Sequence, residues 1–244
     1  MAIKYREDPD LSFLSSCDND DLAILAQYLT TDKDGKTRFS EELLNDPLFK
    51  ECNGQYNKIW QQIAGELQLF GGDSLVNILR GYGILYKEIL CDVCDKLKVN
   101  YNKKQDIARI ESYLLQKIIS DSWANMTEAE RKELLSEIGV DGSLKGAAGL
   151  SAIITAIKLG GFASYRTAAV IANAIAKTLI GKGLTFAANA ALMKGLSILA
   201  GPIGIAVNAL MVIPAMTGSA YRVTIPCVIH VAYMRQKLLN KDRF

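Results

Sequence analysis

Residues 163–180 read Ala-Ser-Tyr-Arg-Thr-Ala-Ala-Val-Ile-Ala-Asn-Ala-Ile-Ala-Lys-Thr-Leu-Ile, and the interpretation of the fold turns on this stretch. Ala168, Ala172 and Ala176 recur at every fourth position, so they share one face of an α-helix. A row of small residues lets a second helix approach closely, as in the packing of membrane helices. The stretch therefore predicts a tightly packed helix, which lies either in a membrane or in a water-soluble helical core.

The same periodicity predicts helices over most of the chain on both sides of this stretch. In the first part the expected helical ranges are 10–30, 40–44, 55–70, 73–97, 104–120 and 127–138. In the second part they are 144–158, 163–180, 183–200, 203–216 and 226–239. The β-branched run 222–225 is interpreted as a strand-like entry to the last helix, too short to form a sheet. The chain is therefore expected to be an all-α, multi-helix protein.

The charges divide the chain into two unlike parts. No Asp or Glu occurs between Asp141 and Asp242, so residues 142–244 carry about ten excess positive charges and residues 1–141 about eight excess negative ones. The formal net charge of +2 is a cancellation of the two. We expect an acidic helical module, 1–141, and a basic, Gly/Ala-rich hydrophobic module, 142–244. Sparse cations among small apolar residues suit either anionic lipid headgroups or an acidic surface, such as that of residues 1–141.

The uncharged span 195–221 raises the question of membrane insertion. Its length exceeds the roughly 20 residues that a helix needs to cross a bilayer. Two prolines interrupt it, however, and leave a piece too short to cross. The span is predicted to be either a membrane segment or a soluble packing segment, and the residues that define it are Gly195, Gly201, Pro202, Gly204 and Pro214.

The side chains that usually carry chemistry form no convincing constellation. Cys91 and Cys94 have metal or redox spacing, but no second pair accompanies them, and His230 is the one histidine of the chain. The Asp32–Gly35 turn lacks three of the positions that a calcium loop requires. We therefore expect no catalytic, cofactor or metal site, reduced cysteines, and no nucleic-acid partner. The polar first ten residues do not resemble a secretory signal, which favours a cytoplasmic location.

Two blocks of sequence resemble the YaaW-like family of uncharacterised bacterial proteins. The first is Trp60-Gln-Gln-Ile-Ala-Gly-Glu-Leu-Gln-Leu-Phe-Gly-Gly-Asp-Ser74, and the second is Gly218-Ser-Ala-Tyr-Arg-Val-Thr-Ile-Pro226. The resemblance implies a distant relation to the ubiquinol–cytochrome c chaperones, which assist assembly of a respiratory membrane complex. It supplies no catalytic residues. The signature residues, all without an assigned role, are Trp60, Glu66, Gly71, Gly72, Asp73, Arg80, Tyr221, Arg222 and Pro226.

These observations favour a non-enzymatic helical interaction protein at or near the inner membrane face. In this interpretation the acidic module binds an unidentified protein partner, and the basic module either contacts an anionic membrane surface or forms a homo-oligomer. The alternative is a soluble assembly chaperone for a membrane complex, in which opposite charge holds the two parts together. An unrecognised enzyme remains a third hypothesis.

Overall fold

The computed structural model describes residues 3–31, 42–71, 83–181, 184, 201, 203–206 and 221–243. Over these ranges the chain is helical and forms no sheet, which confirms the predicted all-α fold. The helices are η1 (Ser12–Ser16), α1 (Asn19–Thr30), α2 (Glu42–Asn45), α3 (Pro47–Glu51), η2 (Tyr56–Ile59), α4 (Trp60–Gly71), α6 (Tyr86–Lys96), α7 (Ile107–Ala124), α8 (Glu128–Ile138), α9 (Gly146–Leu159), α10 (Gly161–Ile180), α12 (Tyr221–Leu239) and η4 (Lys241–Arg243). The expected helix 183–200 and most of 203–216 lie outside the described residues.

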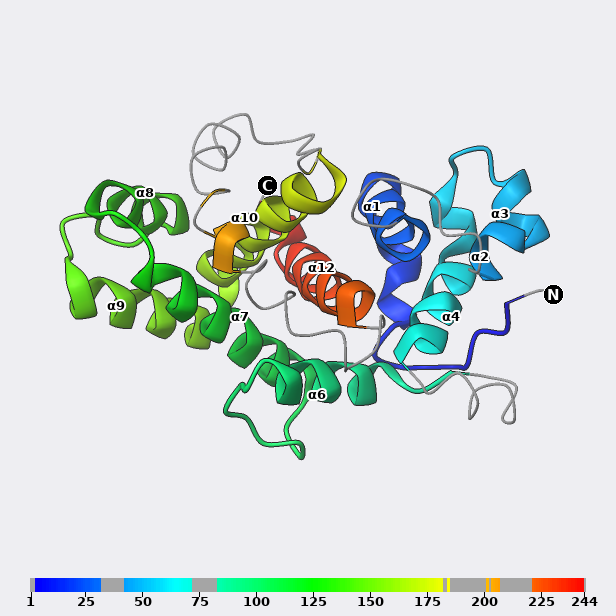
Figure 1. Cartoon of the computed structure of the whole chain (residues 1–244), viewed down its shortest axis with the longest axis horizontal. Helices are drawn as coiled ribbons and strands as arrows, with labels where there is room; N and C mark the ends of the chain where they lie inside the picture. Colours follow the sequence, from blue (N-terminus) through cyan, green and yellow to red (C-terminus); the bar gives the residue numbers. More distant parts are fainter. Residues whose placement is uncertain are drawn as a thin grey trace.

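Helix α12 is the centre of the molecule (Figure 1). It packs against α10, α1, α6, α4 and α7, and thirteen of its nineteen residues are buried. A helix that is covered on all sides is apolar around its whole circumference, and α12 has this character from Val223 to Met234. Helix α12 therefore joins the helices of residues 1–141 to α10.

The structure corrects the strand-like interpretation of residues 222–225. These residues form the first turn and a half of α12, which begins at Tyr221 and contains Pro226 in its interior. Val223, Thr224 and Ile225 are buried. The packing of these β-branched side chains in the core outweighs their modest preference for strands.

The structure also corrects the long helix that was expected over 73–97. Residues 83–85 are not helical, and α6 begins only at Tyr86. The chain passes so close to α4 at Gly83 that an added Cβ would collide with the backbone of Gln68. The buried carboxylate of Asp8 accepts the backbone N–H of Tyr86 at 2.7 Å and thereby caps the first turn of α6.

Predictions that rest on local sequence agree closely with the structure. Helix α8 lies in the expected range 127–138, and Thr127 and Glu130 form a capping box at its start. Helices α9 and α10 occupy nearly the predicted ranges, and Gly160, with a φ of 74°, makes the sharp turn between them. Glycine adopts this left-handed backbone without strain.

The alanine row that opened the sequence analysis is buried. Ala168, Ala172 and Ala176 are at most 1% exposed, on the helix that packs most extensively against α12. The second small-residue row, which includes Gly195, lies outside the described residues. The small side chains of α10 therefore serve close packing inside the protein.

Candidate interaction surface

A buried ion pair ties α12 to α7. The Nε atom of Arg235 donates to both carboxylate oxygens of Glu111, at 3.0 and 3.2 Å, and Tyr86 donates its hydroxyl to the same carboxylate at 2.8 Å. Arg235 also donates to the carbonyl oxygen of Asp10 at 2.7 Å, and its guanidinium lies over the ring of Phe13. Burial raises the pKa of Glu111, whereas Arg235 and Tyr86 oppose that shift.

A second cluster ties α12 to α1. Lys237 contacts Asp21 at 2.7 Å and Asp18 at 2.8 Å, and the side chain of Asp21 is 4% exposed. His230 is also buried, and its Nε2 donates to the carbonyl oxygen of Asp21 at 2.9 Å. The ring of His230 packs edge-on against Tyr28. His230 is therefore a core residue.

These contacts show where two cations of the basic module are used. Arg235 and Lys237 form ion pairs with acidic residues of the segment 1–141. This agrees with the expectation that cations of the basic module contact an acidic surface of the same chain. Their partners lie more than a hundred residues away, so no local spacing could have identified them. These pairs join α12 to α7 and to α1.

The environment of His230 predicts acid-sensitive stability. Its Nδ1 is buried without a hydrogen-bond partner, so a proton added there would meet no acceptor. Burial lowers the pKa of His230 from 6.5, assisted by the nearby charge of Lys237 and opposed by Asp21. A group with a lowered folded-state pKa stabilises the protein fully above its unfolded pKa and loses that contribution as the pH falls below it. We expect the free energy of unfolding to fall by up to about 1.4 kcal/mol per pH unit below about pH 6.5.

The measurement is urea unfolding of the wild type and of His230→Gln between pH 5 and 8. The glutamine amide can still donate to the carbonyl of Asp21 but does not titrate. The free energy of unfolding of the variant should therefore depend less steeply on pH, by the contribution of about one bound proton. Equal slopes for the two proteins would contradict the assignment.

The described part of the first signature block, Trp60–Gly71, forms α4. Trp60 begins this helix and packs edge-on against Tyr5, with 5.3 Å between ring centroids. Glu66 is 2% exposed. Gly71 ends the helix, where an added Cβ would collide with the side chain of Ile89 on α6. These residues hold the N-terminal segment and α6 against α4, which gives them a structural role.

The second block begins α12. Tyr221 lies beneath the ammonium of Lys96, at 5.0 Å from the ring centroid. Arg222 is exposed, whereas Pro226 is buried. Because α4 and α12 pack against each other, the structure brings the elements that carry the two signature blocks together.

Several residues singled out from the sequence lie outside the described part of the chain: Gly72, Asp73, Arg80, Gly195, Pro202 and Pro214. Gly201 and Gly204 are described. Gly204 is buried, and an added Cβ would lie 2.7 Å from the hydroxyl of Thr178 on α10. At Gly204, therefore, the predicted segment packs against the protein.

The two cysteines with metal or redox spacing lie in the core. Cys91 and Cys94 are free, buried thiols one turn apart on α6. Burial raises the pKa of Cys94, which keeps its thiol protonated and unreactive. Among the described residues no cluster of three or more His, Cys, Asp or Glu side chains could hold a metal ion.

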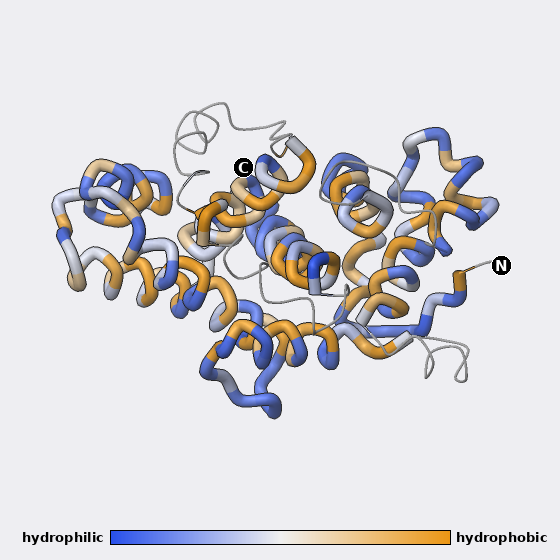
Figure 2. The backbone as a smooth tube through the Cα atoms, in the orientation of Figure 1, coloured by the Kyte–Doolittle hydropathy of each residue, from blue (hydrophilic) through white to orange (hydrophobic). Residues whose placement is uncertain are grey.

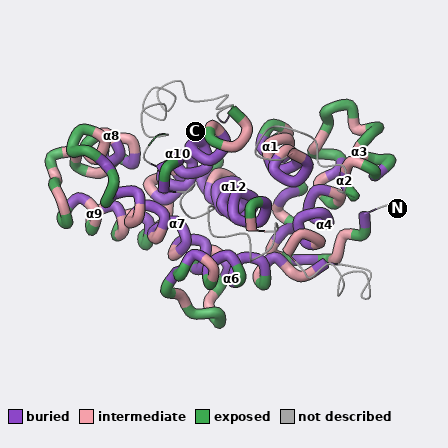
Figure 3. Tube along the Cα trace, in the orientation of Figure 1, coloured by how far each residue is buried: buried purple, intermediate pink, exposed green. Residues whose placement is uncertain are grey.

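Helix α9 presents an uncharged surface to its surroundings. From Gly146 to Ile157 it carries no charged residue, yet only Gly149, Ile153 and Ile157 of its fourteen residues are buried. The hydropathy colouring of Figure 2 and the burial colouring of Figure 3 show this contrast along the helix. We define the α9 face as the residues that α9 leaves exposed: Ala147, Ala148, Ser151, Thr155, Lys158 and Leu159. Leu159 is 82% exposed.

Length and apolar composition do not qualify any one of the described helices to cross a membrane. Helices α9 and α10 meet the criteria only together, as a pair bent by 111°. Most of α10 is buried in the protein, so of this pair it is α9 that offers an open face.

Known bacterial proteins align with this chain over nearly its whole length. A UPF0174 protein of Helicobacter pylori strain J99 is 44% identical, and the alignment covers 100% of this chain and 97% of that protein. The chain belongs to the UPF0174 family. The UPF0174 protein YaaW of Escherichia coli strain K12 is 37% identical, with 97% of each chain covered. The resemblance to the YaaW-like family is thereby confirmed.

Two family models match the UPF0174 chain in succession. Residues 5–39 match a domain of unknown function, DUF3944, and residues 55–230 match the family described as ubiquinol-cytochrome C chaperone. The second match covers more than half of the chain, from the start of η2 into α12, and includes the α9 face. No solved structure matches the chain.

Proposed function

We propose that this protein is a non-enzymatic, chaperone-like binding protein that docks on the inner face of an anionic membrane through α9. The observation that carries the proposal is the α9 face itself. An exposed helix of a soluble protein normally carries charges of both signs toward water. Helix α9 carries none over its first twelve residues, and more than half of these are only partly buried or exposed.

The charges around α9 favour an anionic lipid surface as its partner. Lys145 immediately precedes the helix and Lys158 lies in its last turn, and both are exposed. The exposed residues between them are Ala147, Ala148, Ser151 and Thr155, all small and uncharged. Lysines that flank an uncharged helical stretch attract anionic lipid headgroups.

The chaperone part of the proposal rests on the match of residues 55–230 to the ubiquinol-cytochrome C chaperone family. Arg235 and Lys237 of α12 are engaged in ion pairs within the protein, which suits a protein that binds a client without catalysing a reaction. A protein that holds a client at the membrane needs a stable helical body and one face for lipid. The central α12 and the α9 face are suited to these two needs.

Vesicle flotation tests the proposal directly. We expect the wild type to float with vesicles that contain anionic phospholipid at low salt, and to remain at the bottom with neutral vesicles or in high salt. Ala148→Glu/Thr155→Glu places two carboxylates on the α9 face and should abolish flotation. The matched control, Leu48→Glu/Lys50→Gln on the exposed side of α3, changes the net charge equally and should float like the wild type.

Thermal melting of all three proteins verifies that both variants are folded. If the wild type does not bind anionic vesicles, or if both variants bind equally well, the membrane-docking proposal is wrong.

A second candidate, a soluble assembly chaperone, is favoured by the buried ion pairs. Arg235–Glu111 and Lys237–Asp21 use opposite charges to join the two parts of the chain. In this case the α9 face binds an apolar segment of a client protein, and vesicles neither bind nor compete with it.

A further inference from the structure

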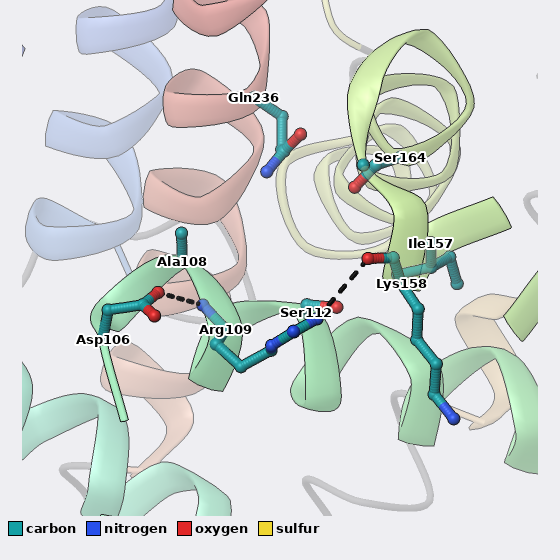
Figure 4. A pocket seen from close by; sticks show the side chains of 9 residues that line it. Asp106, Ala108, Arg109, Ser112, Ile157, Lys158, Ser164 and Gln236 are labelled. Carbon is teal, nitrogen blue, oxygen red and sulfur yellow. Dashed lines mark hydrogen bonds between the residues drawn. The ribbon is translucent and has the colours of Figure 1, made fainter. Parts of the chain in front are cut away.

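A small pocket lies where four helices meet. It is formed by α7, α12 and the turn from α9 to α10, and has a volume of about 240 Å³ (Figure 4). Pockets for drug-sized ligands are typically about 300–1,000 Å³, so this one suits a smaller group. Its lining residues are Asp106, Ala108, Arg109, Ser112, Ile157, Lys158, Gly160, Ser164 and Gln236.

The inner wall of the pocket contains polar side chains of largely buried residues. The side chains of Ser164, 1% exposed, and Gln236, 9% exposed, make no hydrogen bond to any described residue. Ser112, also buried, accepts a hydrogen bond from Gln116, which leaves its own hydroxyl hydrogen available. The polar ends of both side chains are therefore available to a group that enters the pocket.

The pocket is rich in donors and is electrostatically suited to an anion. It adjoins the N-terminus of the twenty-residue helix α10, where Gly160 provides no capping side chain. The first N–H groups of such a helix lack intrahelical partners and carry partial positive charge. Arg109 lies at the exposed rim and donates one N–H to the carbonyl of Lys158 at 3.5 Å, leaving other donors of its guanidinium.

One acidic residue lines the pocket. Asp106 is exposed and caps α7 by accepting the backbone N–H of Arg109 at 2.8 Å. Its charge is therefore engaged at the start of α7. Figure 4 shows the polar ends of Ser164 and Gln236 on the opposite side of the pocket from this carboxylate.

We propose that this pocket binds a phosphate group, with Ser164, Gln236, Ser112 and Arg109 as hydrogen-bond donors beside the N-terminus of α10. A phosphate has enough oxygens to accept from several converging donors, and helix N-termini are established anion sites. The phosphate belongs either to a free phosphate compound or to a phospholipid headgroup. The site does not require that α9 docks on a membrane, and its test is independent of flotation.

Isothermal titration calorimetry and thermal shift test the site with three probes: inorganic phosphate, glycerol 3-phosphate and vesicles that contain phosphatidic acid. We expect at least one probe to bind and to raise the melting temperature, with chloride at equal ionic strength as the reference. Binding of the soluble probes identifies a free phosphate compound as the source. Binding of the vesicles alone, weakened by Gln236→Glu, identifies a lipid headgroup.

Two substitutions assign the binding to the pocket. Gln236→Glu keeps the size of the side chain but replaces two donors by a negative charge, and Ser164→Ala removes one hydroxyl. Each should weaken binding about tenfold or more, because a hydrogen bond to a charged group is lost. The control Lys104→Gln removes an exposed cation outside the pocket and should leave affinity unchanged.

Melting temperatures without ligand verify that the variants fold. If no probe binds at millimolar concentration, or if the control weakens binding as much as Gln236→Glu, the pocket is not a phosphate site.

Discussion

Replacing Arg235 by methionine should destabilise the protein by about 3–5 kcal/mol, because it leaves a buried carboxylate without its cation. The side chain of Glu111 is 1% exposed and that of Arg235 is 16% exposed. Methionine restores much of the volume of the arginine stem but none of its donors. The substitution also removes the hydrogen bond that the carbonyl oxygen of Asp10 accepts from Arg235 at 2.7 Å. Urea unfolding at pH 7 measures the loss.

A matched surface pair provides the control for this prediction. Lys103 and Asp95 are 2.7 Å apart, but their side chains are 63% and 49% exposed. Exposed ion pairs contribute about 0–1 kcal/mol, so Lys103→Met should have a small effect. A loss below about 1 kcal/mol for Arg235→Met would show that the buried pair does not hold α12 to α7.

The pH dependence of the destabilisation by Arg235→Met provides an independent test of the ion pair. Burial already raises the pKa of Glu111, and removing Arg235 removes a charge that opposes this shift. A carboxyl with a raised folded-state pKa favours the folded state at low pH and loses that contribution as the pH rises. The destabilisation by Arg235→Met should therefore be greater at pH 8 than at pH 5. Adding Glu111→Gln should reduce it at pH 8.

The parts of the fold that depend on neighbouring residues could be predicted from the sequence. The capping box of Thr127 and Glu130 involves residues three positions apart, and the alanine row of α10 follows from helical periodicity. For the same reason the ranges of α9 and α10 were nearly correct. The physical forces that determine these features act within one or two helical turns.

The errors arose where distant segments determine local structure. The start of α6 depends on Asp8, which accepts the N–H of a residue 78 positions away. Residues 222–225 are helical because helices from both parts of the chain surround them. A propensity argument includes neither effect, since both are contacts of the folded state.

The candidate sites were only partly accessible from the sequence. The low charge of residues 146–157 was visible, but which face of the helix stays uncovered depends on how α7, α8 and α10 pack against it. No pattern in the sequence indicates the pocket proposed to bind phosphate. Ser164 and Gln236 are ordinary helical residues until α10 and α12 bring them to the same pocket.

The alanine row of α10 allows the sharpest test between a lipid-exposed helix and a packed core. Ala172 is 1% exposed, midway along a helix that α12, α1 and α9 cover. Ala172→Leu adds three carbon atoms where there is no free space, and such overpacking costs about 1–3 kcal/mol, occasionally more. At a lipid-exposed position the same change would be harmless, because lipid tails are as apolar as leucine.

Ala148→Leu on the exposed face of α9 is the matched control, since it makes the same chemical change in another helix. Thermal and urea unfolding should show a clear loss of stability for Ala172→Leu and a change within about 0.5 kcal/mol for Ala148→Leu. The opposite ranking would mean that α10 leaves its contacts with α12 and that α9 is covered. Such a result would contradict the assignment of α9 as the docking face, because that assignment depends on α10 remaining in the core.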